Sequence, residues 1–235
     1  YKHDIGENKK CVEVYQGRDI SFMTDKSLEL LKKVNDKLLL VPTTTRTNEQ
    51  YGRIDMGLGV PKYALTCNGG VLLVDGVEDE AWYNESRALV QDCDLEIEKA
   101  ASFLEKDVNV SFEIRVIKQL FLFTKSDKPE DTIDALRGIL DLEKVDVFSN
   151  GVKVYVVPKT LSKGKAIDRF RKKMNPKKVI AAGDSEFDIT MLDAADIALA
   201  PVELQDKISK TQCVALEGNR LFSEELLEWV NSNIN

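Results

Sequence analysis

Short apolar segments alternate with amphipathic segments at both ends of this chain, and the alternation is interrupted in the middle. Apolar runs of strand length occupy Leu38–Val41, Tyr63–Cys67, Val179–Ala182 and Ile197–Ala200. Strands that alternate with helices indicate a parallel sheet, whereas the order helix, two strands, helix, two strands within 77–157 indicates an antiparallel sheet with helices on one side. We therefore expect an α/β domain made of 1–76 and 158–235, with an α+β (αββαββ) domain inserted at 77–157.

Local signals predict where several elements begin. Cys11–Tyr15 and Ile20–Met23 flank a Gln-Gly-Arg-Asp turn and form a hairpin pattern. Thr24 is positioned to cap a helix that runs to about residue 35, and Thr47 with Gln50 has capping-box spacing. Further along the chain we expect helices at Glu85–Glu105, Pro129–Leu140, Lys163–Met174, Glu186–Ala194 and Ser223–Val230, and strand pairs within Val110–Thr124 and Val145–Val157.

Composition narrows the classes of protein. A chain of 235 residues with 43% hydrophobic and 31% charged residues is typical of one or two globular domains. The net charge of −7 argues against a nucleic-acid partner, which would require a basic surface. No apolar run reaches the roughly 18 residues of a membrane span, and the polar start does not resemble a signal peptide. We expect a cytoplasmic protein without a membrane partner.

Few residues are available for nucleophilic or zinc chemistry. The four cysteines form no C-x-x-C pair, which argues against a zinc site and a disulfide framework, and they stand at Cys11, Cys67, Cys93 and Cys213. The sequence has one histidine, His3, so a Ser-His-Asp triad would depend on that residue alone. There is no G-x-x-x-x-G-K-[ST] phosphate loop.

The strongest chemical signal is the segment Ala181–Leu192, AAGDSEFDITML, which follows a predicted parallel strand. It places Asp184 and Asp188 where the strand turns into a helix, and ligands bind at such carboxyl ends. Carboxylates at this position suit Mg²⁺, a hard cation that prefers oxygen ligands. The alternative is structural: Ser185 and Asp188 would form a capping box, with Asp184 as a solvated turn residue.

The pattern G-D-S-x-x-D-x-x-M-L resembles the fourth motif of the haloacid dehalogenase superfamily, in particular its Cof-type and sugar-phosphatase branches. Leu40–Arg46 is similar to the second motif, a strand that ends in Thr-Gly-Arg. The resemblance aligns Thr44 with the threonine that hydrogen-bonds the transferring phosphoryl group, and Thr45 stands where that motif has glycine. Without the resemblance, this threonine run would be interpreted as a strand end followed by a helix cap.

Two further segments resemble the same family. Pro158–Ile167 is similar to the third motif, which maps its phosphate-neutralising lysine onto Lys163. Ala64–Val71 resembles the Asn-Gly segment that leads into the inserted domain, with Asn68 at the key position. Taken alone, Lys163 would be a solvated lysine beside a Ser162 cap, and the Asn-Gly pair a hairpin turn.

The resemblance fails at the motif with which the family's chemistry begins. That motif, D-x-D-x-T, carries the nucleophilic aspartate and a second aspartate that acts as acid and base, and it should precede the hairpin. Asp4 has no second aspartate two residues later, and Asp92 with Asp94 follows the second motif instead. We expect about ten to twenty upstream residues, one buried strand plus its motif, to supply it. Phe187 also differs from the asparagine common in Cof-type members.

Together these motifs imply a Rossmann-like core with an inserted cap and a Mg²⁺-dependent phosphatase. The implied substrate is a small phosphorylated metabolite, with a sugar phosphate as the expected class, hydrolysed through an aspartyl-phosphate. Thr44 and Lys163 would be catalytic, Asp184 and Asp188 would form the metal site, and Thr45, Arg46 and Asn68 would line the substrate. A catalytically inactive binding protein and a phosphomutase are the alternatives. The sequence leaves the oligomeric state open.

Overall fold

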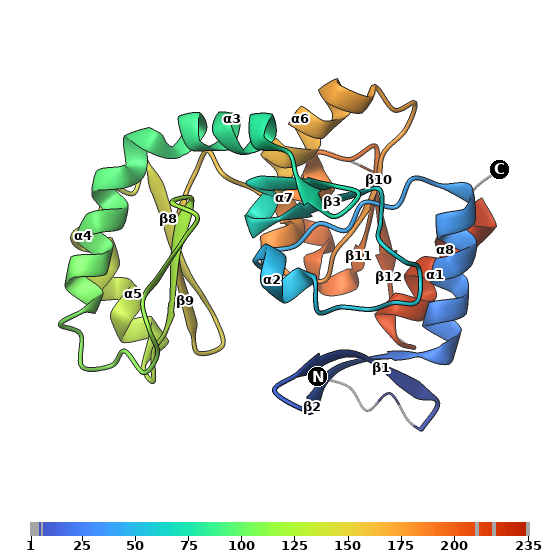
Figure 1. The fold of residues 1–235 in the computed structure, drawn as a ribbon, viewed down its shortest axis with the longest axis horizontal. Helices are drawn as coiled ribbons and strands as arrows, with labels where there is room; N and C mark the ends of the chain where they lie inside the picture. The colour runs from blue at the N-terminus through green and yellow to red at the C-terminus, as the bar shows by residue number, and fades with distance from the viewer. Residues whose placement is uncertain (1–4, 6, 210–211, 218–219, 234–235) are drawn as a thin grey trace. The chain divides into compact units, whose positions relative to one another are not determined.

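The chain divides into two units of mixed α and β structure (Figure 1). The structure is a computed structural model that describes residues 5, 7–209, 212–217 and 220–233, so His3 and Asp4 lie outside the described residues. Unit 1 comprises Tyr1–Val77 and Lys163–Asn235, and unit 2 comprises Glu78–Ser162. Among the described helices, none combines the length and the apolar character that a membrane crossing requires.

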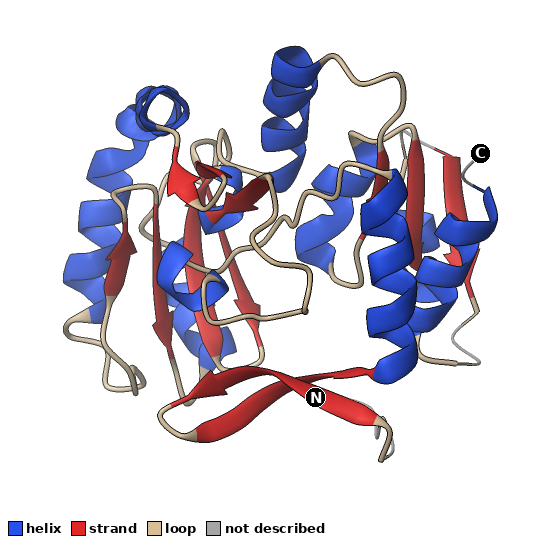
Figure 2. Cartoon of the chain, turned by 45° about the vertical axis from the view of Figure 1, so that its right-hand side comes forward, coloured by secondary structure: helices blue, strands red, loops and turns tan. Residues whose placement is uncertain are grey.

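A parallel sheet buried on both faces forms the centre of unit 1. Its strands lie in the order β10 (Ile180–Ala182), β11 (Ile197–Pro201) and β12 (Gln212–Leu216). On one face, Ile197 and Leu199 pack with α1 (Asp25–Lys37) and α8 (Phe222–Asn233). On the other face, Ala198 and Ala200 pack with α7 (Ile189–Asp193), η4 (Val202–Lys207) and Ile167 of α6 (Lys163–Met174). Successive side chains of β11 pack on opposite faces of the sheet because a strand has a two-residue period. Figure 2 shows helices on both sides of these strands.

The N-terminal hairpin is confirmed. Strands β1 (Lys9–Tyr15) and β2 (Arg18–Thr24) pair antiparallel, and a two-residue turn joins them. Gln16 and Gly17 both have positive φ angles, 51° and 74°, as a turn that matches the twist of a hairpin requires. Thr24 ends β2 and caps α1, its hydroxyl accepting a hydrogen bond from the amide of Ser27 at 3.0 Å.

The buried strand expected at Leu38–Val41 is wrong. These residues are irregular, and Leu39 is 52% exposed. Only Thr43 forms a bridge, a parallel one to Leu65 of β3 (Tyr63–Thr66). A strand needs hydrogen-bonding neighbours, and among the described residues Leu38–Val41 has no paired strand. The downstream elements are α2 (Asn48–Tyr51), whose capping box is confirmed, β4 (Val71–Val74) and β5 (Val77–Glu78), which extend the β3 sheet in the order β3-β4-β5.

Unit 2 is an antiparallel sheet with helices on one face. Its elements are α3 (Glu80–Val90), η2 (Gln91–Cys93), α4 (Asp94–Leu104), β6 (Arg115–Ile117), β7 (Phe121–Lys125), α5 (Pro129–Arg137), β8 (Val145–Asn150) and β9 (Lys153–Pro158). The strand order is β6-β7-β9-β8. The single helix expected at Glu85–Glu105 is interrupted by η2, and Arg87 bridges the break through an ion pair to Asp94 at 2.9 Å. The apolar stripe runs through the break in phase, so periodicity alone does not reveal it.

Candidate active site

Asp188 organises the turn that follows β10. Its Oδ2 accepts hydrogen bonds from the amides of Asp184 and Ser185, each at 3.2 Å, and from the Ser185 hydroxyl at 2.8 Å. Ser185 and Asp188 form the capping box of η3 (Glu186–Asp188), the structural alternative that the sequence left open. The turn therefore points its backbone amides at one buried carboxylate.

Lys163 binds the other oxygen of the same carboxylate. Its Nζ lies 2.5 Å from Asp188 Oδ1, and both side chains are 8% exposed. Lys163 is the first residue of α6, and α6 packs against η3. The structure thus brings together two of the predicted site residues, with the lysine held as a buried cation rather than as a solvated one.

Two glycines make this close approach possible. A Cβ built on Gly183 would lie 2.3 Å from Asp188 Cβ, and one built on Gly164 would lie 2.2 Å from the carbonyl oxygen of Thr190. Real Cβ atoms essentially never come so close to another heavy atom. Both glycines belong to the quoted motifs, and the reason for them is steric: Gly183 leaves room for the Asp188 side chain, and Gly164 leaves room for the Thr190 backbone.

The loop that ends the predicted second motif is held by backbone hydrogen bonds to β3 and η1 (Cys67–Gly69). Thr44 donates its amide to Leu65 at 2.8 Å and accepts from the amide of Asn68 at 3.0 Å. The Thr44 hydroxyl accepts a hydrogen bond from the amide of Arg46 at 3.1 Å. Asn68, with φ of 59°, adopts the left-handed conformation that asparagine tolerates better than most residues. Thr44, Arg46 and Asn68 therefore lie together, and Thr45 between them is half-buried.

The helix α6 lies between the Thr44 loop and the Asp188 turn and contacts the elements around both. It packs against η1, which carries Asn68, and against η3, which carries Asp188. All of the sequence-predicted site residues belong to unit 1.

Sequence reasoning missed an ionic cluster on the hairpin beside this loop. Glu13 of β1 is 1% exposed and binds Arg46 at 2.6 Å and the Ser21 hydroxyl at 2.6 Å. Arg53 places its Nε 3.4 Å from the same carboxylate and stacks on Tyr15 at 4.3 Å. Burial raises the pKa of Glu13, but hydrogen bonds from Arg46 and Ser21 outweigh it, so this pKa lies below its ordinary value. A lone glutamate in an alternating strand carries no local signal of such partners.

The predicted metal residues have different environments. Asp184 is exposed, whereas both oxygens of Asp188 are occupied by protein donors. Within the described part of the chain, no group of three or more histidine, cysteine or acidic side chains could hold a metal ion. Mg²⁺ keeps several waters and commonly takes one or two carboxylates together with phosphate oxygens. The exposed Asp184 carboxylate fits one position of such a site.

Comparison with known proteins gives a consistent result. A family model described as haloacid dehalogenase-like hydrolase matches residues 74–210. The chain is 26% identical over 207 residues to a probable sucrose-phosphatase 3b of Arabidopsis thaliana, covering 83% of this chain and 45% of that protein. It is 23% identical over 205 residues to a phosphoglycolate phosphatase of Sulfurisphaera tokodaii, covering 85% and 81%.

A solved structure supports the same fold. The sucrose-phosphatase of a Synechocystis species, in complex with sucrose and phosphate, superposes with a TM-score of 0.65 at 18% identity, covering 89% of this chain and 92% of that one. At this identity the likeness concerns the fold alone. The chain spans less than half the length of the Arabidopsis relative.

Proposed function

The chain belongs to the haloacid dehalogenase-like hydrolases, and from that membership we propose that it is a Mg²⁺-dependent phosphatase of a small phosphorylated metabolite, a sugar phosphate. The observation that carries the proposal is the buried Lys163–Asp188 pair at the carboxyl end of β10, beside the exposed Asp184. A cation held at a strand end is suited to offset phosphate charge. The similarity to a sucrose-phosphatase supports the choice of a sugar phosphate.

In this proposal each residue has one task. Lys163 neutralises the phosphoryl oxygens, and Asp188 fixes its ammonium group in place through the 2.5 Å contact. Thr44 donates its hydroxyl to the phosphoryl group, since its oxygen already accepts from Arg46 and its proton is free to turn outward. Thr45, Arg46 and Asn68 line the substrate. Their positions are held by the loop's hydrogen bonds to β3 and η1.

We assign the metal position to Asp184, with Asp188 bracing the turn behind it. When bound, Mg²⁺ would neutralise phosphate charge and orient the phosphoryl group for in-line attack. The turn's own contribution is geometric, because the Asp184 and Ser185 amides bind Asp188 and leave the Asp184 carboxylate pointing to solvent.

We place the nucleophilic aspartate on a strand upstream of Tyr1, and unit 2 in the role of a cap that selects the substrate. Two features of unit 1 support an additional strand. Among the described strands, β10 pairs only with β11, and Leu38–Val41 remains irregular with Leu39 exposed. A strand inserted beside β10 would pair with the edge of β10 that has no neighbouring strand among the described residues.

The test is phosphate release by the protein expressed from its natural reading frame, with a panel of sugar phosphates in the presence of Mg²⁺ or a chelator. We expect Mg²⁺-dependent turnover that is abolished by Asp184→Asn and retained by the matched variant Asp206→Asn, which changes an exposed aspartate on η4. Equal activity of the Asp184→Asn and Asp206→Asn variants would defeat the assignment. Ligand binding without release would favour an inactive binding protein, and isomer formation a phosphomutase.

A further inference from the structure

Two arginines of unit 1 share one buried carboxylate on the hairpin. Glu13 Oε1 lies 2.6 Å from Nη1 of Arg46 and 3.4 Å from Nε of Arg53, and its Oε2 accepts a hydrogen bond from the Ser21 hydroxyl at 2.6 Å. Glu13 is buried, whereas the side chains of Arg46 and Arg53 are 28% and 30% exposed. We call Arg46 and Arg53 the arginine pair. Its two positive charges reach solvent, and a single negative charge is buried behind them.

Arg53 is the member of the pair with the weaker hold on Glu13. Within the described residues its guanidinium group makes no hydrogen bond, and its Nε is buried. One face of the guanidinium stacks on Tyr15, with 4.3 Å between the guanidinium carbon and the ring centroid. Stacking leaves the N–H donors at the edge of the guanidinium plane, where they can bind an acceptor. Arg53 is therefore a half-buried cation whose hydrogen-bonding capacity the described residues do not use.

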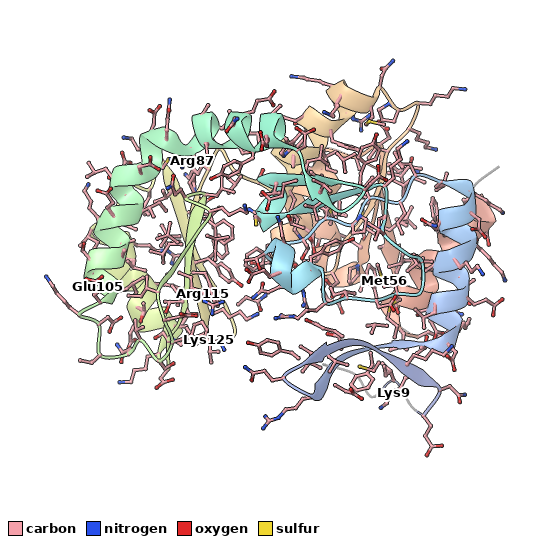
Figure 3. The ribbon with its side chains drawn as sticks, viewed as in Figure 1. Lys9, Met56, Arg87, Glu105, Arg115 and Lys125 are labelled. Carbon is pink, nitrogen blue, oxygen red and sulfur yellow. The ribbon has the colours of Figure 1, made fainter. Side chains whose placement is uncertain are left out.

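Backbone contacts fix the position of Arg53 beside the hairpin. The next residue, Ile54, forms an antiparallel bridge with Glu13. Figure 3 shows the loop that carries the labelled Met56 beside the hairpin that carries the labelled Lys9. The fold of the backbone thus places Arg53 at the buried carboxylate, and the stacking on the hairpin then restricts its side chain. A cation held in one place loses little conformational entropy when it binds a ligand.

Arg46 links the arginine pair to the predicted phosphoryl site. Its amide donates a hydrogen bond to the hydroxyl oxygen of Thr44 at 3.1 Å, and its guanidinium group binds Glu13 at 2.6 Å. Glu13 in turn contacts Arg53. A single residue, Arg46, therefore separates the Thr44 hydroxyl from the carboxylate that the arginine pair shares, and a small phosphorylated metabolite can span that separation.

We infer that the arginine pair binds a second anionic group of the substrate, a carboxylate or a phosphate other than the phosphate that is cleaved. Planar guanidinium groups bind the oxygens of both kinds of group through paired N–H donors. Glu13 compensates only one of the two positive charges, and the second anionic group compensates the other. The inference rests on the proposed function and deepens it, because it restricts the substrate to metabolites with two anionic groups and names Arg53 as a residue that determines specificity.

The test is calorimetric titration of the 235-residue chain, which measures binding without turnover. The three probes share a glucose 1-phosphate framework and differ at carbon 6: glucose 1-phosphate has a hydroxyl group there, glucuronic acid 1-phosphate a carboxylate and glucose 1,6-bisphosphate a phosphate. We expect at least one of the two doubly anionic probes to bind about tenfold more tightly than glucose 1-phosphate. The probe with the larger gain in affinity identifies the second group as a carboxylate or a phosphate.

Variants at position 53 assign this gain to Arg53. Arg53→Gln should abolish the gain, and Arg53→Lys, which keeps the charge and loses the planar pair of donors, should retain part of it. The matched control Lys32→Gln removes one positive charge from an exposed position on α1 and should keep the full gain. The gain is a ratio of two dissociation constants measured on the same preparation, so a loss of folded protein in one variant does not change it.

Either of two outcomes would overturn the inference: no gain for either doubly anionic probe in the unaltered chain, or the same gain in Arg53→Gln as in Lys32→Gln. Failure of the arginine pair is distinguishable from failure of the proposed function. A gain that Arg53→Gln abolishes, together with no phosphate release by the protein from its natural reading frame, defeats only the phosphatase. Phosphate release together with equal gains in Arg53→Gln and Lys32→Gln defeats only the second anionic group.

Discussion

At the scale of single residues, the site depends on how closely Asp188 approaches the backbone of Gly183. The carboxylate of Asp188 accepts hydrogen bonds from Lys163, Asp184 and Ser185, and the turn that carries the last two passes close to the Asp188 side chain. A hydrogen atom at position 183 leaves the necessary space. The sequence signal at this turn is accordingly a glycine beside two aspartates, and the glycine contributes as much to the geometry as the acids do.

We predict that Gly183→Ala destabilises unit 1 by about 1–3 kcal/mol, the usual cost of overpacking. The new methyl group would displace Asp188 and with it the Lys163 ammonium group. Chemical denaturation measures the change in unfolding free energy. The control is Gly138→Ala, where the added Cβ meets Ala135 O at an ordinary 3.4 Å, and this variant should keep its stability. Equal losses in both variants would show that the close approach at 183 is unimportant.

The cluster around Glu13 gives a second prediction at this scale. Glu13→Gln removes the charge that holds Arg46 and Arg53 and leaves the buried Nε of Arg53 without its anion. Because hydrogen bonds to charged groups contribute about 1.5–3 kcal/mol, we expect a loss of about 2 kcal/mol in unfolding free energy. Glu29→Gln is the matched control, since its 2.7 Å ion pair with Lys33 is exposed and should contribute little. A Glu13 variant as stable as the Glu29 variant would contradict the expectation.

The residue pattern alone predicted the candidate site where its members are neighbours in sequence, and the family resemblance added Lys163 and Thr44. Asp184, Ser185 and Asp188 lie within five positions of one another, so their spacing, which is typical of turns and helix caps, identifies them. Glu13 and Arg46 are separated by 33 positions and meet only because the hairpin folds back on the loop. The sequence around Glu13 or around Arg46 gives no indication that these two residues are partners.

At the scale of elements, the hairpin and the strands expected at Tyr63–Cys67, Val179–Ala182 and Ile197–Ala200 were predicted well, whereas the strand expected at Leu38–Val41 was not. The hairpin carries its own turn, and α6 begins and ends where its pattern does. Leu38–Val41 has the composition of a buried strand, but pairing determines strand formation, and its partner is not among the described elements. Apolar composition therefore indicates that a segment can form a strand, but it does not show that the segment forms one in the folded chain.

We predict that Gln16→Asn stabilises the hairpin by up to about 1 kcal/mol, the order of the penalty that a side chain pays in the left-handed region. Gln16 has φ of 51° before Gly17, and asparagine followed by glycine is the preferred pair for this turn. Denaturant unfolding followed by circular dichroism would detect the change. The complementary variant Gly17→Ala should destabilise, because its φ of 74° disfavours a Cβ. A stability order opposite to this one would exclude the assigned turn geometry.

At the scale of the whole molecule, each unit contains a buried carboxylate whose ionisation is coupled to the stability of the fold. Glu13 lies in unit 1 and Glu96, 3% exposed, lies in unit 2. Hydrogen bonds from Lys99 and from the amide of Asp141 lower the pKa of Glu96 and outweigh the opposing effect of burial. The pKa of each group in the folded chain is thus below the ordinary value of 4.5. The ionised form stabilises each fold above that value, and the contribution is lost as the pH falls through the lowered pKa.

The last prediction follows from this linkage. We expect the melting temperature to fall as the pH is lowered through about 4.5 and below, and to fall less steeply in the variants Glu13→Gln and Glu96→Gln, whose amides do not titrate. The variant Asp206→Asn, altered at an exposed position, should follow the unaltered chain. Because the two glutamates lie in different units, following melting by amide resonances of each unit separates their effects. If neither variant flattens the pH dependence of its own unit, these carboxylates do not carry the acid sensitivity, and the ionic contacts around them contribute equally in both protonation states.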